Sequence, residues 1–166
     1  MRQLALVLGL LGLFLTSSFP FNSYAKDLTN RLGIGYSDQF SVDLPSIAMK
    51  YHTSPDMSFG TQLGVQTESN NSKLGFAIKI NKVIFPEDNM NFYMGVGAGL
   101  LSSKIAGVNN SGVELTAYCG SEFFLPGLDS LGLSFEAGLG ITSLSNGVNF
   151  RTLADHPLRA GMIFYF

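Results

Sequence analysis

The stretch that decides the fold is Pro157-Leu-Arg-Ala-Gly-Met-Ile-Phe-Tyr-Phe166. Every second residue in it is apolar, in the series Leu158, Ala160, Met162, Phe164 and Phe166. The other register is mixed and contains a charged residue, Arg159. Alternation with a period of two residues is typical of a β-strand whose two faces meet different surroundings. We therefore expect a strand over residues 157–166.

This ending resembles the C-terminal strand of bacterial outer-membrane β-barrel proteins, which finish on an aromatic residue preceded by alternating apolar positions. The resemblance implies that the barrel assembly machinery binds the chain through this strand and reads Phe164 and Phe166 as the assembly signal. A closed barrel also provides the last strand with a partner, because it pairs with the first strand and leaves no open edge in lipid. The alternative is a soluble β-domain whose last strand is buried.

Seven further segments show the same alternation. The expected strands are residues 31–36, 46–53, 58–67, 73–84, 91–101, 112–124 and 131–142. In each of them one face is apolar, and the other consists mainly of Gly, Ala, Ser, Gln, Asn or charged residues. That second face is too small to fill the dry interior of a soluble barrel, but it suits the lumen of a narrow barrel whose apolar face meets lipid.

The predicted fold class is therefore all-β, an eight-stranded antiparallel transmembrane up-and-down β-barrel over residues 26–166. The composition agrees, because 46% of the residues are apolar and only 13% are charged, about half of the charged share of a soluble domain. The chain as a whole resembles the small outer-membrane β-barrel families with eight strands. This resemblance implies a monomer surrounded by outer-membrane lipids and lipopolysaccharide.

Residues 1–25 are predicted to be a signal peptide. Arg2 supplies the positive charge, residues 4–15 the apolar core, and Ser23-Tyr24-Ala25 the cleavage site. Export by this route predicts the outer membrane of a Gram-negative bacterium. The net charge of −2 gives no reason to expect a nucleic-acid partner.

The connections between the expected strands fall into two classes. Residues 54–57, 85–90 and 125–130 each contain Pro and Asp and are expected to be turns. Residues 37–45, 68–72, 102–111 and 143–156 are expected to be loops at the other end. Five aromatic residues are expected to form an outward girdle near the turns: Tyr51, Phe59, Phe92, Phe123 and Phe166.

Charged residues on the inward faces are the main candidates for a functional site. They are the cations Arg31, Lys50, Lys79 and Arg159 and the anions Glu114, Glu122 and Glu136. Because an isolated buried charge is very costly, we expect these groups to pair and to plug the lumen. The alternative is a charged filter in a thin pore. His52 is expected to form hydrogen bonds in the lumen, Cys119 to be a small buried residue, and no metal or cofactor is predicted.

A catalytic alternative rests on three residues near the rim, Ser143, Ser145 and His156. By strand parity they share the outward face, as in outer-leaflet lipid hydrolases with barrel folds. The preferred function is a non-enzymatic outer-membrane protein with a structural or surface-interaction role and a mostly filled lumen. A lipid A hydrolase at the rim and a narrow, porin-like pore or conduit for hydrophobic solutes are the alternatives.

Overall fold

The computed structural model describes residues 26–38, 40, 44–68, 71–105, 107–145, 147–152 and 159–166. The predicted signal peptide at 1–25 and the catalytic candidate His156 lie outside these residues and stay predictions. Within the described part of the chain, no helix has the length and apolar character needed to cross a membrane.

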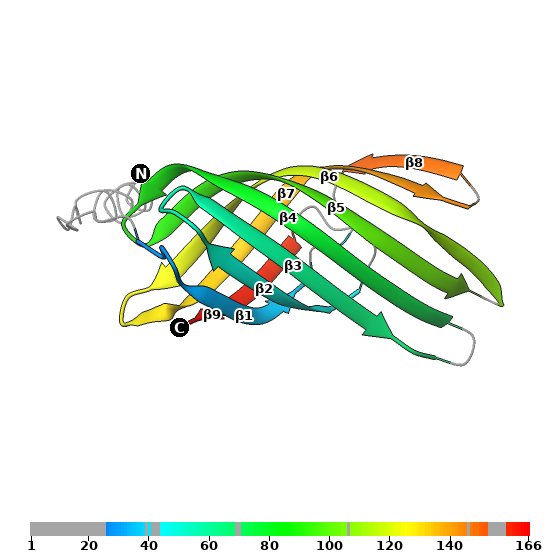
Figure 1. Ribbon diagram of the computed structural model, residues 1–166, viewed down its shortest axis with the longest axis horizontal. Coiled ribbons are helices and arrows are strands. Elements are labelled where there is room, and N and C mark those ends of the chain that lie inside the picture. The colour runs from blue at the N-terminus through cyan, green and yellow to red at the C-terminus, as the bar shows by residue number, and fades with distance from the viewer. Residues whose placement is uncertain are drawn as a thin grey trace, which may run out of the picture.

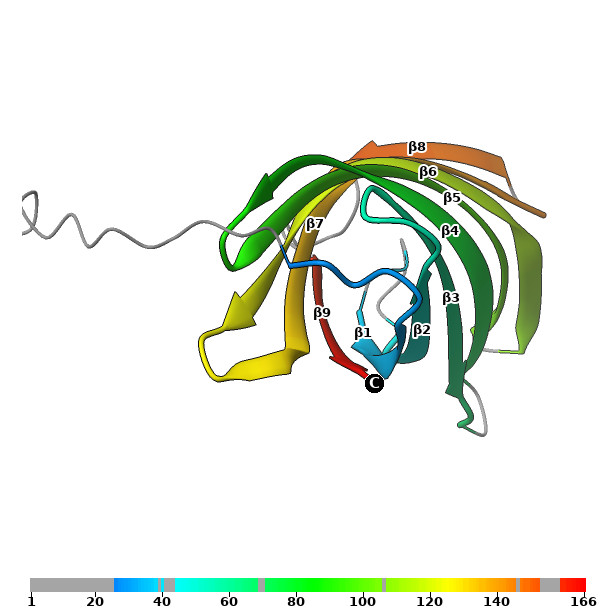
Figure 2. The same ribbon diagram turned by 60° about the vertical axis from the view of Figure 1, so that its left-hand side comes forward.

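The described residues form an antiparallel β-barrel. Its strands are β1 (Leu32–Ser37), β2 (Ser46–His52), β3 (Met57–Gln66), β4 (Asn71–Glu87), β5 (Met90–Ile105), β6 (Val108–Leu125), β7 (Leu128–Leu144), β8 (Gly147–Thr152) and β9 (Arg159–Tyr165). Strands β1 to β7 pair with their neighbours in chain order, β7 also pairs with β9, and β9 pairs with β1. Figure 2 shows β9 between β7 and β1. The ring of eight is closed, which confirms the predicted all-β fold with eight antiparallel strands in an up-and-down barrel.

Strand β8 lies outside that ring, beside β7. It was not predicted, because residues 143–156 were expected to be a loop. It pairs only with the C-terminal part of β7, from Leu139 opposite Thr152 to Leu144 opposite Gly147. Phe150 of β8 lies opposite Ile141 of β7, and both side chains are exposed. The short β9 pairs with β7 only up to Glu136, and β8 supplies hydrogen-bond partners for that edge from Leu139 to Leu144.

The strands differ widely in length. Strands β4 to β7 have 16 to 18 residues, whereas β1, β2 and β9 have six or seven. Most of the expected loop at 102–111 is strand, since β5 continues to Ile105 and β6 begins at Val108, with Gly107 in the turn at a φ of +84°. Figure 1 shows the long strands extending well beyond β1, β2 and β9.

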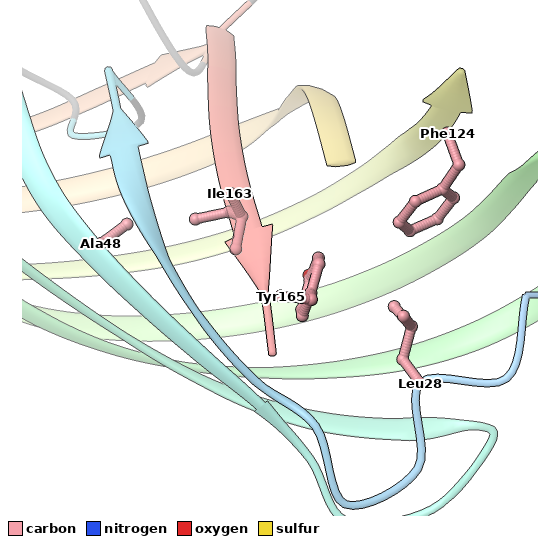
Figure 3. Close-up of a cluster of buried hydrophobic side chains, with 5 residues drawn as sticks. All are labelled: Leu28, Ala48, Phe124, Ile163 and Tyr165. Atoms are coloured by element: carbon pink, nitrogen blue, oxygen red, sulfur yellow. The ribbon is translucent and has the colours of Figure 1, made fainter. Parts of the chain in front are cut away.

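One end of the barrel carries the short turns and the described residues nearest both termini, and we call it the proximal end. Inside it lies an apolar cluster of Leu28, Ala48, Phe124, Ile163 and Tyr165 (Figure 3). Two carboxylates at this end, outside the strands, accept local hydrogen bonds. Ser54 Oγ donates to Asp56 Oδ1 at 2.7 Å and lowers the pKa of Asp56, and the Thr29 hydroxyl and amide lower the pKa of Asp27 in the same way.

The opposite, distal end is filled from the connection between β1 and β2. This connection was expected to be a polar loop, but Phe40 is 1% exposed and Leu44 is 0% exposed. Both pack inside the barrel with Ala77 and Leu101. Gly75 leaves the necessary room, because a Cβ there would lie 3.0 Å from Leu44 Cδ2 and 3.1 Å from Phe40 Cζ. Part of the distal interior is therefore apolar.

Candidate functional site

The two faces of the barrel wall have opposite character. Large apolar residues on the outward face are exposed, among them Ile78, Val96, Leu115 and Phe164. The inward face buries charged and amide side chains, among them Gln62, Lys79, Glu122, Glu136 and Arg159. A polar interior and an apolar exterior reverse the usual order of a soluble domain. The candidate site is therefore the lumen.

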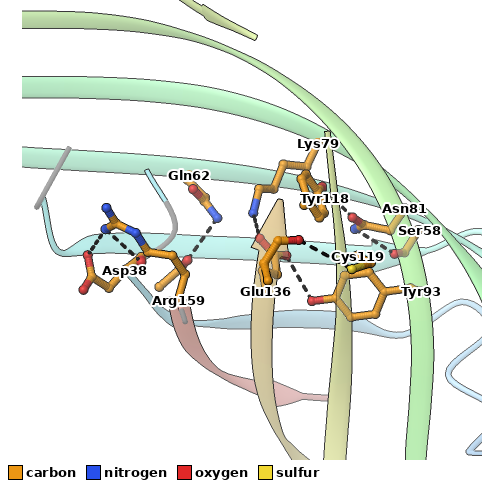
Figure 4. Close-up of polar contacts among 12 residues, drawn as sticks. Asp38, Ser58, Gln62, Lys79, Asn81, Tyr93, Tyr118, Cys119, Glu136 and Arg159 are labelled. Carbon is orange, nitrogen blue, oxygen red and sulfur yellow. Dashed lines mark hydrogen bonds and ion pairs between the residues drawn. The ribbon is translucent and has the colours of Figure 1, made fainter. Parts of the chain in front are cut away.

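Two lysines and two glutamates form buried ion pairs across this lumen. Lys50 Nζ lies 2.7 Å from Glu122 Oε2, and Lys79 Nζ donates to Glu136 Oε2 (Figure 4 shows the second pair). The other oxygen of each glutamate accepts from a tyrosine. Tyr165 donates to Glu122 Oε1 at 2.6 Å, and Tyr93 donates to Glu136 Oε1 at 3.0 Å. Each carboxylate therefore has a partner on both oxygens, which a buried anion requires.

Aromatic contacts connect the two ion pairs. Lys50 Nζ lies 4.7 Å from the centroid of the Tyr93 ring, and Lys79 Nζ lies 4.5 Å from that of Tyr118. Both distances allow a cation–π interaction. Tyr118 also donates to Asn81 Oδ1 at 2.6 Å. We call the joined set the lumen network: Lys50, Lys79, Tyr93, Tyr118, Glu122, Glu136 and Tyr165.

Glycines make room for these tyrosines. A Cβ at Gly95 would lie 2.5 Å from Tyr118 Cε2, and a Cβ at Gly120 would lie 2.8 Å from Tyr93 Cζ. The small inward residues thus stand opposite the long ones, as the sequence analysis expects of a narrow barrel.

The space left in the lumen is small. The cavity beside Lys50, Gln62, Lys79 and Glu136 has a volume of about 30 Å³. A water molecule needs about 10–15 Å³ of such space, so the cavity has room for two waters or so. Among the described residues, this cavity has no room for a molecule much larger than water.

The other charged candidates are Arg159, Arg31 and Glu114, of which Arg159 is opposite Glu136 in the register of β7 and β9. Arg159 Nη1 donates to Asp38 Oδ1 at 3.0 Å and to the Asp38 carbonyl at 3.2 Å. Asp38 was not among the predicted site residues, because it lies in an expected loop. Arg31 contacts Ser130 Oγ at 3.5 Å, and Glu114 is buried on β6 opposite Thr142.

The surroundings of Cys119 and His52 differ from those predicted from the sequence. Cys119 is a free, exposed cysteine, not a buried residue, because its position on β6 belongs to the outward face. His52 is buried against the edge of the Tyr165 ring, with 5.6 Å between ring centroids. Its Nε2 has no hydrogen-bond partner within the described part of the chain.

The structure describes the two rim serines, Ser143 and Ser145, but not His156, their expected catalytic partner. Ser145 Oγ donates to the Ser111 carbonyl at 3.1 Å and lies 3.4 Å from the Ser111 amide, which donates to it. Ser143 is half-buried at the end of β7. His156 and the adjacent Asp155 lie outside the described residues. In the described part, no group of three or more His, Cys, Asp or Glu residues is arranged to hold a metal ion.

The aromatic residues expected in the girdle all lie on the outward face. Tyr51, Phe59, Phe92, Phe123 and Phe166 are 38–61% exposed. Phe164 and Phe166 lie side by side with 6.4 Å between their ring centroids. They flank Tyr165, which points inward into the lumen network.

Comparisons with known proteins agree on the fold. No family model matches the chain, and no curated protein matches it. The crystal structure of the N-terminal β-barrel domain of Pseudomonas aeruginosa OprF is similar to it, with a TM-score of 0.58 and 12% sequence identity. The similar region covers 83% of this chain and 98% of that chain. The fold shown is that of the OprF barrel, a closed eight-stranded antiparallel barrel.

Proposed function

We propose that this protein is an integral outer-membrane protein of a Gram-negative bacterium, with a structural or surface-interaction role and a closed lumen. The observation that carries the proposal is the lumen network, a set of buried ion pairs inside a barrel whose outer surface is apolar. Such an outer surface is stable in lipid, and buried charges tolerate a narrow interior only when they are paired. The fold similarity to the OprF barrel supports the same proposal.

The outward face also sets the position in the membrane. Exposed apolar residues run from the aromatic girdle at the proximal end to Val65, Leu74, Leu100, Val113 and Ile141 towards the distal end. Outer-membrane barrels have short turns on the periplasmic side and an aromatic girdle at the interface. The proximal end is therefore periplasmic, and the distal end faces outward from the cell.

Location is the first expected result. The protein should fractionate with outer membranes and resist extraction by carbonate, because its apolar surface is buried in lipid. Unboiled protein should migrate differently from boiled protein on a denaturing gel, since a closed barrel resists unfolding by detergent. Recovery as a soluble periplasmic monomer would overturn the proposal.

Conduction is the second expected result. Purified protein in planar bilayers should show little or no steady ion current, because a cavity of about 30 Å³ holds only a few water molecules. A large, steady conductance of the unmodified protein would show a water-filled lumen and would favour the pore over the closed barrel.

A non-enzymatic role is the third part of the proposal. The Ser145 hydroxyl is engaged by the Ser111 backbone, which does not favour a free nucleophile. Replacing Ser143, Ser145 or His156 by Ala should leave the acylation pattern of lipid A unchanged in an expressing strain. If wild-type expression removes an acyl chain and the His156→Ala variant at equal protein level does not, the hydrolase is the better proposal.

A further inference from the structure

An apolar groove crosses the outward face of strands β4 to β7. Its volume is about 550 Å³, within the usual range of about 300–1,000 Å³ for small-molecule sites. It is lined by Met57, Lys82, Met94, Cys119, Ala137 and Leu139, among others. Met94, Cys119 and Ala137 are neighbours in register on β5, β6 and β7. Cys119 and Ala137 are too short to fill the space between their larger neighbours.

Lys82 gives the groove a charged end. It is exposed on the outward face of β4, opposite Met57, the first residue of β3. Its place is therefore at the proximal, periplasmic interface. Within the described part of the chain no carboxylate lies within ion-pair distance of it. Asp56 in the adjoining turn interacts with it at longer range, and the Asp56 carboxylate already accepts from Ser54.

A lysine at this place favours an anionic partner from the membrane. A cation on the lipid face of a barrel is unfavourable unless its ammonium reaches the interface. The phosphodiester groups of the inner leaflet lie at that interface, next to the apolar groove. From Lys82 on β4 to Leu139 on β7 the groove crosses three strand spacings, roughly 15 Å. This length suits an extended acyl chain.

We propose that the groove binds one glycerophospholipid of the inner leaflet, with its phosphodiester on Lys82 and one acyl chain between Met94 and Leu139. The inference rests on the proposed membrane location. A second copy of the chain fits less well. A two-fold contact through this groove brings the same patch from both copies together, with a Lys82 on each side of an apolar interface.

The test is native mass spectrometry of the full barrel released from nanodiscs of phosphatidylglycerol and phosphatidylcholine. Wild-type protein should retain one phosphatidylglycerol per barrel. Lys82→Gln should reduce the retained fraction at least fivefold. Lys104→Gln, which removes an exposed charge from the distal end of β5, should not reduce it. Ala137→Phe should fill the groove and reduce retention without a change of charge.

The outcomes separate this inference from the proposed function. Each variant is first checked for the migration shift between unboiled and boiled protein. A wild-type protein that does not insert into lipid contradicts the proposed membrane function itself. An inserted protein that retains no lipid, or whose Lys82→Gln and Ala137→Phe variants retain as much lipid as wild type, contradicts the groove alone. Complexes of two barrels without lipid would assign the groove to a second copy.

Discussion

Glu136→Ala is expected to lower the free energy of unfolding of the barrel by about 3–5 kcal/mol, the range for breaking a buried ion pair by removal of one partner. The ion pair between Lys79 and Glu136 is lost, and the Tyr93 hydroxyl loses its acceptor. Lys50 keeps Glu122, so half of the lumen network stays intact. The measurement is urea unfolding of the protein in lipid vesicles. Unfolding is monitored on gels of unboiled samples by the loss of the band of folded protein.

Two controls separate the buried pair from charge alone. Asp129→Asn removes a carboxylate from the exposed pair with Lys26, and pairs of this kind contribute about 0–1 kcal/mol. A double variant, Lys79→Met with Glu136→Leu, removes both buried charges and should recover most of the loss, since apolar pairs often replace buried ion pairs at little cost. A Glu136→Ala variant as stable as wild type would show that the ion pair of Lys79 and Glu136 does not stabilise the barrel.

The same variant should conduct more than wild type. Truncation of Glu136 removes a side chain from the narrow part of the lumen and breaks its ion pair with Lys79. Brief openings in planar bilayers are expected for Glu136→Ala and not for Asp129→Asn. Identical, silent recordings for both variants would place the main block elsewhere, with the Phe40 and Leu44 cluster as the next candidate.

The sequence was enough to predict the strands and their faces, because a period of two residues is a local signal. It placed Lys50, Lys79, Glu122 and Glu136 inside the barrel. It could not pair them, since pairing depends on the stagger of strands that are far apart in the chain. Lys79 and Glu136, for example, are 57 residues apart. Alternation shows which face a residue is on, but not its height in the lumen.

The errors have related causes. Phe40 and Leu44 lie in residues 40–44, where apolar and polar residues alternate, but so short a run inside an expected loop did not indicate that they fill the space over Gly75. Strand β8 has only six residues, and a predicted loop around it concealed its alternation. Cys119 was expected from strand parity to be a small buried residue, but it shares the parity of Val113, Leu115 and Phe123, which is that of the outward, exposed face.

Phe166→Arg is expected to reduce the assembled barrel in membranes about tenfold, which corresponds to about 1.4 kcal/mol. The reason is the β1–β9 seam, five register pairs from Gly33 opposite Tyr165 to Ser37 opposite Gly161. The Phe166 amide extends this seam by donating to the Leu32 carbonyl at 3.0 Å. Its ring packs beside Phe164 on the outward face, and the sequence resemblance predicts that the assembly machinery recognises both rings.

Phe150→Arg is the matched control. Phe150 is an outward aromatic residue of nearly equal exposure, 68% against 61% for Phe166, but it lies on β8, outside the ring of eight strands. The cost of placing an arginine near the membrane interface is about 0–1 kcal/mol and is similar for the two variants. A larger loss at Phe166, measured as heat-modifiable protein in isolated outer membranes, therefore reports on closure and assembly of the seam. Equal levels of the two variants would mean that the strand pairs alone close the barrel and that the terminal rings act only as lipid-facing surface.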